Sequence, residues 1–484
     1  MIIARKIAYN VLVSSIAKVL ATVLALISIG LITRYLGKEG FGNYATVLAF
    51  FSFFGALGDL GLYSVSTREI SRPGADEEKI MSNIFTLRLC SSLLILAGAP
   101  IVVIFFPYPK EVKEAIVIIA ASFLFSSAYQ VLNGVFQKNL AMDRVALSEL
   151  AGKALQVILI YAAIRLNLGF SWVVSSLLFY MVLSFSLVFF WSRRYVRIQL
   201  KFDFSYWKTF LKESYPLGIS ALITFAYFKL DTIILSIVKS SADVGIYSAA
   251  YKVIENITFF PSMLVGLIFP IISQNIISDF EKFKDIANKT FKVFLVLVVP
   301  LVIGTLFLSE GVIQLIGGAG FAESANVLRI LIFALAFIFF SNLLNAILIS
   351  ASLQKKLMVI LGMAAFLNIV SNFIFIPRFS YLGAASVSVF TELFVSLAAL
   401  FLTVKYVKYW PSAENVWGIF LSGAAMAIAL FLTSFLNFFA RGLVGVFVYF
   451  VFLWIFRAVR TEEITSIVSK KDDRTAAIDQ APLV

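Results

Sequence analysis

The sequence of 484 residues contains no histidine and a single cysteine, Cys90. Without histidine, the chain lacks the commonest metal ligand and general base. One cysteine permits neither an internal disulfide nor a cysteine-based metal site. No G-x-x-x-x-G-K-[ST] motif is present, which excludes nucleotide hydrolysis by the P-loop route. We therefore expect no catalytic residue, no metal site, no bound cofactor and no enzymatic activity.

Charged residues are scarce, at 14% of the chain, whereas 61% of the residues are hydrophobic and the mean hydropathy is +0.96. This balance excludes an ordinary soluble globular protein and indicates a polytopic membrane protein. Basic loops beside anionic lipid account for the net charge of +13, so no nucleic-acid partner is expected. The N-terminal apolar run is long enough to span and lacks an A-x-A cleavage pattern, which predicts a retained first helix.

Fourteen apolar segments have the length of a membrane-spanning helix, about 17–25 residues. They lie at approximately 11–35, 41–63, 84–106, 115–137, 149–166, 170–192, 214–238, 245–273, 290–308, 325–350, 357–377, 381–404, 416–436 and 441–457. Lysine and arginine residues in the connecting segments divide 26 to 8 between the two sides. The positive-inside rule then places both termini in the cytoplasm. We expect an all-α protein that is integral to the cytoplasmic (plasma) membrane.

Short stretches of the first half of the chain recur in the second half. "FGNYA" (41–45) resembles "VGIYSAA" (244–250), and "VLNGVFQ" (131–137) resembles "LLNAILI" (343–349). Equivalent spans are six apart, so both copies run in the same direction, as in lobes related by an axis along the membrane normal. This predicts 14 transmembrane helices: two pseudo-symmetric six-helix lobes around a central cleft, plus two C-terminal helices.

The chain is accordingly divided into five predicted parts. These are an N-lobe of spans 1–6 (1–192), a cytoplasmic interfacial linker (193–213), a C-lobe of spans 7–12 (214–404), spans 13 and 14 (405–460), and a disordered cytoplasmic tail (461–484). The linker mixes aromatic and basic residues, which is typical of a segment at the membrane interface but equally of a basic loop. The tail is polar, which favours disorder.

Nine charged residues within the predicted spans are the candidate site residues. Ionisable groups at this depth usually face the bundle interior or a watery cavity rather than lipid. Bases outnumber acids, which favours an anionic cargo such as a pyrophosphate. We predict substrate binding by Lys18, Arg88, Lys153, Lys229, Lys252 and Arg329, and ion coupling by Asp231, Glu255 and Glu392.

Four of these charges fall in one predicted layer. Lys229 and Asp231 are two residues apart, about 200° around a helix, so they cannot pair with each other. Depth estimates place both at the level of Lys252 and Glu255. Asp231 with Lys252, or Lys229 with Glu255, are both feasible ion pairs. The layer is either a closed cluster that fixes packing or one that exchanges partners during transport.

Polar residues also form stripes along several predicted helices. Asn10, Ser14 and Lys18 recur every four residues on one face, and Glu149 with Lys153 is a favourable i,i+4 pair. Such stripes either face a cleft or hydrogen-bond one helix to another. For Lys18 the full charge favours the cleft, because helix-to-helix packing seldom needs one.

Longer stretches resemble a known family. They are "ITRYLGKEGFGNYA" followed by "GDLGLYSVSTREISR", and "SYPLGISALITFAYFKLDTIILSIV" followed by "DVGIYSAAYKVIE". From about residue 5 to 460, the chain resembles the polysaccharide transporter (Wzx-type flippase) branch of the multidrug/oligosaccharidyl-lipid/polysaccharide exporter superfamily. The resemblance implies movement of a polyprenyl-pyrophosphate-linked oligosaccharide from the cytoplasmic to the outer leaflet by alternating access, for cell-surface polysaccharide or O-antigen biosynthesis.

The resemblance also implies a coupling ion, either sodium or a proton. Expected partners are the lipid-linked oligosaccharide, membrane lipids, and a glycan polymerase and ligase, with the chain itself a monomer. Two alternatives stay open within the superfamily: a peptidoglycan lipid-precursor flippase, which also moves a lipid pyrophosphate, and a cation-coupled multidrug exporter. An exporter of cations would favour an acid-lined cleft, whereas bases predominate here. A membrane glycosyltransferase needs carboxylates on sizeable external loops, which the chain lacks.

Overall fold

The computed structural model describes residues 2–59, 61–72 and 74–458, and over those ranges the chain forms helices and no strands. The predicted tail, 461–484, lies outside the described residues. The chain divides into two compact units, which we describe separately. Unit 1 comprises Met1–Asn256, Val312–Leu331 and Met358–Val395, and unit 2 comprises Ile257–Gly311, Ile332–Leu357 and the chain from Ser396 onward.

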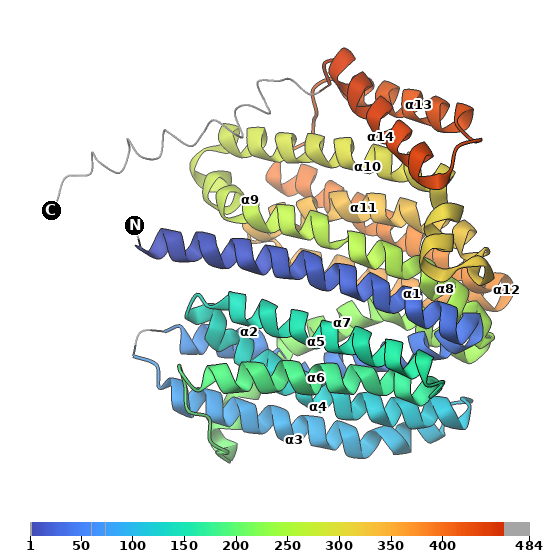
Figure 1. The fold of residues 1–484 in the computed structure, drawn as a ribbon. Helices are drawn as coiled ribbons and strands as arrows, with labels where there is room; N and C mark the ends of the chain where they lie inside the picture. The colour runs from blue at the N-terminus through green and yellow to red at the C-terminus, as the bar shows by residue number, and fades with distance from the viewer. Residues whose placement is uncertain (1, 60, 73, 459–484) are drawn as a thin grey trace. The chain divides into compact units, whose positions relative to one another are not determined.

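Unit 1 is built mainly from the first eight helices (Figure 1). They are α1 (Ile2–Asp59), α2 (Leu62–Ile70), α3 (Glu77–Ile104), α4 (Lys110–Lys138), α5 (Met142–Arg165), α6 (Phe170–Ser192), α7 (Phe204–Val238) and α8 (Ser241–Ile257). Helix α4 packs against α3, α6 and α1, and α1 also packs against α5 and α7. The contact between α1 and α7 positions the charged residues of the candidate site.

Unit 2 contains the remaining helices in whole or in part. They are α9 (Phe259–Ser278), α10 (Phe280–Gly317), α11 (Ser324–Ser350), α12 (Gln354–Leu402), η2 (Thr403–Val407), α13 (Val416–Leu432) and α14 (Phe438–Ile455). The C-terminal end of α10, the short helix η1 (Ala319–Phe321), the start of α11 and the middle of α12 belong to unit 1. Pro261, in the first turn of α9, follows the break between α8 and α9, where a proline is tolerated.

Eleven helices in the described chain are long and apolar enough to cross a membrane. Two of them contain a non-helical residue: Gly37 (φ 64°) in α1 and Ser380 (φ 49°) in α12. Gly37 lies between the first and second predicted spans, and Ser380 between the eleventh and twelfth. Helix α13 is apolar but shorter. The structure therefore shows an all-helical chain with many spans, and the number fourteen stays a prediction.

Two glycines allow α1 and α8 to touch backbone to backbone within unit 1. A Cβ at Gly42 would lie 1.7 Å from the carbonyl oxygen of Ser241, and a Cβ at Gly245 would lie 2.0 Å from that of Lys38. Only glycine fits such an approach. The offset of 203 between "FGNYA" and "VGIYSAA" maps Gly42 onto Gly245 and Lys38 onto Ser241, so it maps one contact onto the other. The two contacts between α1 and α8 are therefore equivalent, as expected for two helices related by a pseudo-twofold axis.

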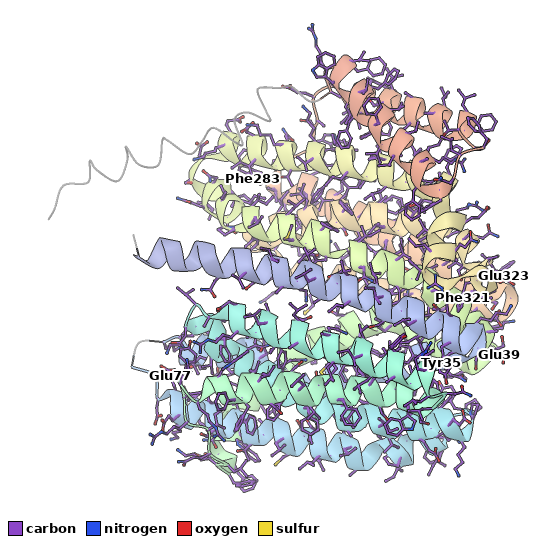
Figure 2. The ribbon with its side chains drawn as sticks, in the orientation of Figure 1. Tyr35, Glu39, Glu77, Phe283, Phe321 and Glu323 are labelled. Atoms are coloured by element: carbon purple, nitrogen blue, oxygen red, sulfur yellow. The ribbon has the colours of Figure 1, made fainter. Side chains whose placement is uncertain are left out.

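The end of α10 is fixed to the same part of α1. Arg34 Nη2 donates to the carbonyl oxygen of Leu315 at 2.6 Å, and Thr33 Oγ1 donates to that of Ile316 at 2.9 Å. These donors satisfy carbonyls that a helix end leaves unpaired. Figure 2 shows Tyr35, Glu39, Phe321 and Glu323 gathered at this end of unit 1, with Glu77 at the opposite end.

Candidate functional site

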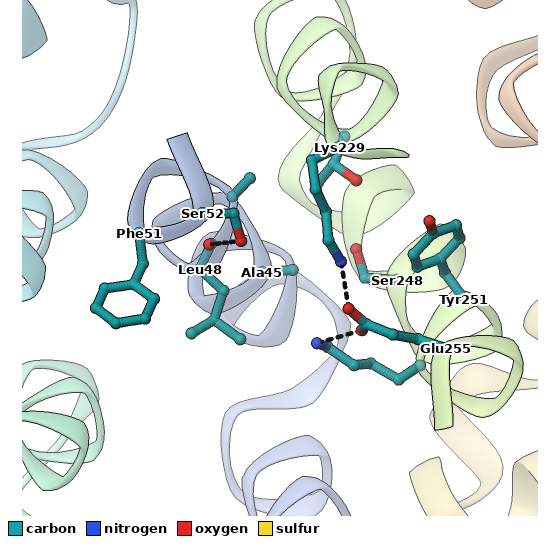
Figure 3. Close-up of a pocket in the computed structure, with 11 residues that line it drawn as sticks. Ala45, Leu48, Phe51, Ser52, Lys229, Ser248, Tyr251 and Glu255 are labelled. Carbon is teal, nitrogen blue, oxygen red and sulfur yellow. Dashed lines mark hydrogen bonds and ion pairs between the residues drawn. The ribbon is translucent and has the colours of Figure 1, made fainter. Parts of the chain in front are cut away.

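A pocket of about 160 Å³ lies among α1, α7 and α8 in unit 1 (Figure 3). Helix α1 contributes small and apolar side chains, while α7 and α8 contribute the charged ones. The lining residues are Ala45, Leu48, Ala49, Phe51, Ser52, Lys229, Thr232, Ser248, Tyr251, Lys252 and Glu255. Three charges on one wall of a small pocket make it the strongest candidate for polar recognition in the described chain.

Glu255 is clamped between two lysines in this pocket. Its Oε1 lies 2.7 Å from Lys229 Nζ on α7, and its Oε2 lies 2.6 Å from Lys252 Nζ one turn back on α8. Figure 3 shows the Lys229 side chain directed at the Glu255 carboxylate. Lys229 also stands 4.9 Å above the ring of Tyr251, close enough for a cation–π interaction. The predicted Lys229–Glu255 pair is confirmed, and this group carries a net charge of +1.

Asp231 lies on a different face of α7 and does not line the pocket. The alternative pair with Lys252 is not formed; Asp231 is 3% exposed and accepts hydrogen bonds from the N–H of Thr232 at 2.6 Å and from the Tyr247 hydroxyl. Tyr247 in turn lies 3.3 Å from Ser388 Oγ on α12. The separation of about 200° between positions 229 and 231 explains the difference. The structure brings together three of the four predicted layer charges.

A second lysine–glutamate group joins α1 and α5. Lys18 Nζ lies 3.2 Å from Glu149 Oε1. Lys153 makes no ion pair among the described residues; its Nζ donates to Gln156 Oε1 at 3.1 Å and stands 4.4 Å above the Tyr180 ring. The predicted pair of Glu149 with Lys153 is therefore wrong, because Glu149 turns toward Lys18 and Lys153 toward the aromatic ring.

The two groups are neighbours in unit 1. Lys153 is close enough to Lys252 for their positive charges to repel each other. A single anion with two or more charged oxygens would relieve that repulsion by lying between them.

The remaining predicted residues lie elsewhere. Arg88 is fully buried in α3, where its Nη1 lies 3.4 Å from Ser127 Oγ of α4, and Arg329 in α11 donates to Asn326 Oδ1 at 2.8 Å. Neither lines the pocket. Glu392 in α12 is 6% exposed, interacts with Tyr227, and forms no ion pair within the described ranges. Its role in ion coupling stays a prediction.

Three tyrosines of the site were not predicted. Tyr247 binds Asp231, Tyr251 supports Lys229, and Tyr180 supports Lys153. The sequence does hold a signal for two of them. Tyr247, Tyr251 and Glu255 follow each other at intervals of four, so they share one face of α8. Nothing in the spacing connects Tyr180 with Lys153, since they come from different helices.

Unit 2 holds a larger pocket of about 550 Å³ with an almost wholly apolar lining. Helices α9, α10, α11, α13 and α14 form it, together with the last residue of α8. The lining residues are Ile257, Phe260, Met263, Leu264, Leu297, Pro300, Leu301, Gly304, Leu308, Phe339, Met426, Gly442, Val446, Tyr449 and Phe450. Its chemistry suits a hydrocarbon chain and offers little to a polar group.

In the part of the chain that the structure describes, eleven helices of spanning length and a charged pocket in unit 1 define a polytopic integral membrane protein of the transporter class. The chain belongs to the polysaccharide biosynthesis protein family, whose model matches residues 7–276. The MatE family model matches residues 216–374. These matches agree with the resemblance to the polysaccharide transporter branch of the exporter superfamily.

Curated relatives carry transporter names. A putative O-antigen transporter of Shigella flexneri is 26% identical over 420 residues, which cover 81% of this chain and 96% of that protein. The probable flippase AglR of Haloferax volcanii is 26% identical over 211 residues, 43% of this chain and 44% of that protein. A capsular polysaccharide biosynthesis protein, CapF of Staphylococcus aureus, is 25% identical over 300 residues, 60% of this chain and 74% of that protein.

Solved structures show the same fold. The lipid II flippase MurJ in an inward closed conformation superposes with a TM-score of 0.75 at 18% identity, covering 92% of this chain and 98% of that one. An inward-facing multidrug resistance MATE transporter gives a TM-score of 0.62 at 16% identity, covering 80% and 94%. At these identities the likeness concerns the fold alone.

Proposed function

We propose that the protein is a flippase that moves a polyprenyl-pyrophosphate-linked oligosaccharide from the cytoplasmic to the outer leaflet of the cytoplasmic membrane. The relatives named as an O-antigen transporter and as a flippase support this class. The product would be cell-surface polysaccharide or O-antigen. The observation that carries the proposal is the pair of lysine–glutamate groups in unit 1, one exposed and one partly buried.

The cationic groups suit a pyrophosphate. Lys229 and Lys252 share one carboxylate, and Lys153 has none among the described residues, so the site has more positive than negative charge. Moving a charged head group through roughly 30 Å of hydrocarbon is costly, and fixed ammonium groups lower that barrier. Lysine acts as a compact point charge with three donors, suited to phosphate oxygens in changing positions.

The apolar pocket of unit 2 suits the polyprenyl chain. Its volume of about 550 Å³ and its hydrocarbon lining would shield isoprene units from water. The charged pocket of unit 1 and the apolar pocket of unit 2 each suit one chemical part of a lipid-linked sugar.

The crossing of α1 and α8 supports alternating access. With both termini in the cytoplasm, the contact of Gly42 with Ser241 would lie at the outer end of the helices and hold that end shut. Opening to the outside would then require the two glycine contacts and the Arg34–Leu315 hydrogen bond to separate. The two predicted six-helix lobes are the bodies that would move.

Two carboxyl groups are available for ion coupling. Asp231 and Glu392 are buried and have no lysine or arginine within ion-pair distance in the described chain. A buried carboxylate without a cation is costly, so each either holds a proton or binds a cation such as sodium. Glu255 is already neutralised by two lysines, which makes it the weakest of the three predicted coupling residues.

Deletion of the gene, scored for lipid-linked oligosaccharide on the cytoplasmic leaflet, tests the proposal. We expect accumulation that wild-type protein and a Lys289→Gln control relieve, because Lys289 belongs to an exposed ion pair of α10. Lys153→Gln should relieve it poorly. Absence of any accumulating lipid-linked oligosaccharide would contradict the flippase function.

A peptidoglycan-precursor flippase is the second candidate, because the same lysines suit any lipid pyrophosphate. The deletion separates the two. Accumulation of the peptidoglycan lipid precursor with unchanged surface glycan would support this alternative.

For ion coupling, transport into vesicles should lose its dependence on a sodium or proton gradient in Asp231→Asn or Glu392→Gln protein. Unchanged gradient dependence in both variants would exclude these carboxyls.

A further inference from the structure

The connection between α6 and α7 is held in place against α3. It has no regular secondary structure through residues 196–203. Three of its N–H groups, at alternate positions, donate to buried side chains of α3: Gln199 to Ser82 Oγ at 3.1 Å, Lys201 to Thr86 Oγ1 at 3.0 Å, and Asp203 to Asn83 Oδ1 at 3.2 Å. Side chains of α3, rather than a neighbouring strand, accept the hydrogen bonds of these backbone N–H groups.

The same segment is also anchored by apolar packing. Val196 is 3% exposed and belongs to a buried cluster with Phe85, Trp207 and Phe210. Asp203 caps α7 by accepting from the N–H of Tyr206 at 2.9 Å. A loop this well fixed presents its outward side chains in defined positions, unlike an ordinary basic loop.

A basic pocket lies at the end of α6 and the start of this segment. A cavity of about 340 Å³ is lined by Phe189, Ser192, Arg193, Val196, Arg197, Ile198 and Gln199. From Phe189 through Lys201 there are four basic residues, Lys201 included, and no acidic one. Arg193 stands 5.0 Å from the Phe189 ring centroid, and neither Arg193 nor Arg197 pairs with a carboxylate in the part of the chain that the structure describes.

Exposed apolar side chains continue from this pocket in both directions along the chain. Phe190 lies on α6 just before it, and Leu200, Phe202 and Phe204 follow; all four are at least 59% exposed. The rings of Phe202 and Phe204 pack on Trp207, which fixes their positions. Exposed aromatics beside arginines at the end of a spanning helix are typical of the level where head groups meet acyl chains.

We propose that Arg193 and Arg197 form a binding site for the phosphate of an anionic membrane phospholipid, with Phe202 and Phe204 against its acyl chains. Two guanidinium groups without carboxylate partners match phosphate oxygens. The apolar surroundings select a lipid rather than a free phosphate, because a soluble anion would leave them in water. This site is separate from the charged pocket of α1, α7 and α8, since the two share no lining residue.

The test measures lipid retention by the purified full-length protein in detergent, by native mass spectrometry with phosphatidylglycerol and phosphatidylcholine as probes. An arginine near anionic lipid contributes about a factor of five to binding, so the wild type should prefer phosphatidylglycerol roughly 25-fold. Arg193→Gln with Arg197→Gln should abolish the preference. Lys208→Gln with Lys212→Gln removes the same charge from the exposed side of α7, outside the pocket, and should keep it.

Each possible result of this experiment either supports or overturns the proposed lipid site. No preference in the wild type, or an unchanged preference in the double arginine variant, would overturn it. Equal loss in the arginine and lysine variants would show diffuse attraction rather than a site, which also overturns it. Phe202→Ser with Phe204→Ser should weaken retention of phosphatidylglycerol severalfold; if excess inorganic phosphate displaces the lipid completely, the site belongs to free phosphate. Unchanged thermal unfolding of every variant establishes that each is folded.

Discussion

Unit 1 contains two groups of one glutamate and two lysines, and they are built differently. In the first, Lys18 approaches Glu149 at 3.2 Å with its side chain 45% exposed, and Lys153 rests on Tyr180 without a carboxylate. In the second, Glu255 contacts both of its lysines at 2.7 and 2.6 Å. The first group is open and leaves one ammonium group available, whereas the second is closed.

This difference predicts different roles for the two groups: a closed group fixes neighbouring helices, and an open group binds an anion. A closed cluster satisfies its charges internally, and an entering anion must break an ion pair to reach either lysine. An open cluster offers an ammonium group at little cost. The two groups do not arise from the repeat, because the offset of 203 maps Lys229 onto Leu26. We infer that the second group fixes α7 to α8, while the first receives the cargo's phosphates.

The largest expected effect comes from opening the closed group. Glu255→Gln leaves Lys229 and Lys252 facing each other in a partly buried pocket. Removing one partner of a buried pair costs roughly 3–5 kcal/mol, and partial exposure of the carboxylate places the cost near the lower end, about 3 kcal/mol. Thermal unfolding of the purified protein measures it.

The open group supplies the control for that experiment. Glu149→Gln removes an exposed ion pair and should cost below about 1 kcal/mol. Adding Lys252→Gln to Glu255→Gln should recover part of the lost stability, since it removes the repulsion. Equal destabilisation by the two glutamate substitutions would contradict the distinction between open and closed groups.

The next effect concerns binding. Lys153→Gln should weaken binding of a short-chain polyprenyl pyrophosphate roughly 30-fold, because a hydrogen bond to a charged group contributes about 2 kcal/mol. Lys252→Gln should weaken it only about threefold, since Lys252 is already occupied by Glu255. Equilibrium binding to protein in nanodiscs compares them. A larger loss for Lys252→Gln would assign the cargo to the closed group.

Some of this could be predicted from sequence. Apolar runs gave the helices, and a spacing of two residues correctly separated Lys229 from Asp231. Spacing along one helix could not predict which of two possible lysines a glutamate pairs with. Glu149 had a suitable lysine four residues away on α5 yet pairs with Lys18 of α1, because contacts between helices decide the rotamers.

Residues that act through their surroundings were equally hard to predict. Tyr180 stacks on Lys153 from another helix. Arg88 was predicted to bind substrate because of its charge, but it is buried where α3 packs against α4. A charge in an apolar span marks a residue that needs partners, but the sequence does not say whether those partners are protein or cargo.

A smaller effect on pyrophosphate binding is expected from the tyrosine rings that contact Lys153 and Lys229. Tyr180→Leu should weaken pyrophosphate binding about fivefold, since a partly desolvated cation–π contact contributes about 1 kcal/mol and orients Lys153. Tyr180→Phe keeps the ring and should be close to wild type. Tyr251→Leu should change binding less than twofold, because Glu255 still holds Lys229. Equal losses in the two leucine variants would show that the rings matter for packing alone.

The smallest effect is the salt dependence of the two interhelical ion pairs. A double-mutant cycle on Lys18 and Glu149 should give a coupling of about 0.5 kcal/mol at low salt, because exposed pairs are weak. At about 1 M sodium chloride the Debye length falls to roughly 3 Å, and this coupling should vanish. The cycle on Lys229 and Glu255, measured by the same thermal unfolding, should give a larger coupling that retains most of its value, since the pocket shields it from counterions. If both couplings disappeared together, the second group would be as open as the first, and the division of roles between them would fail.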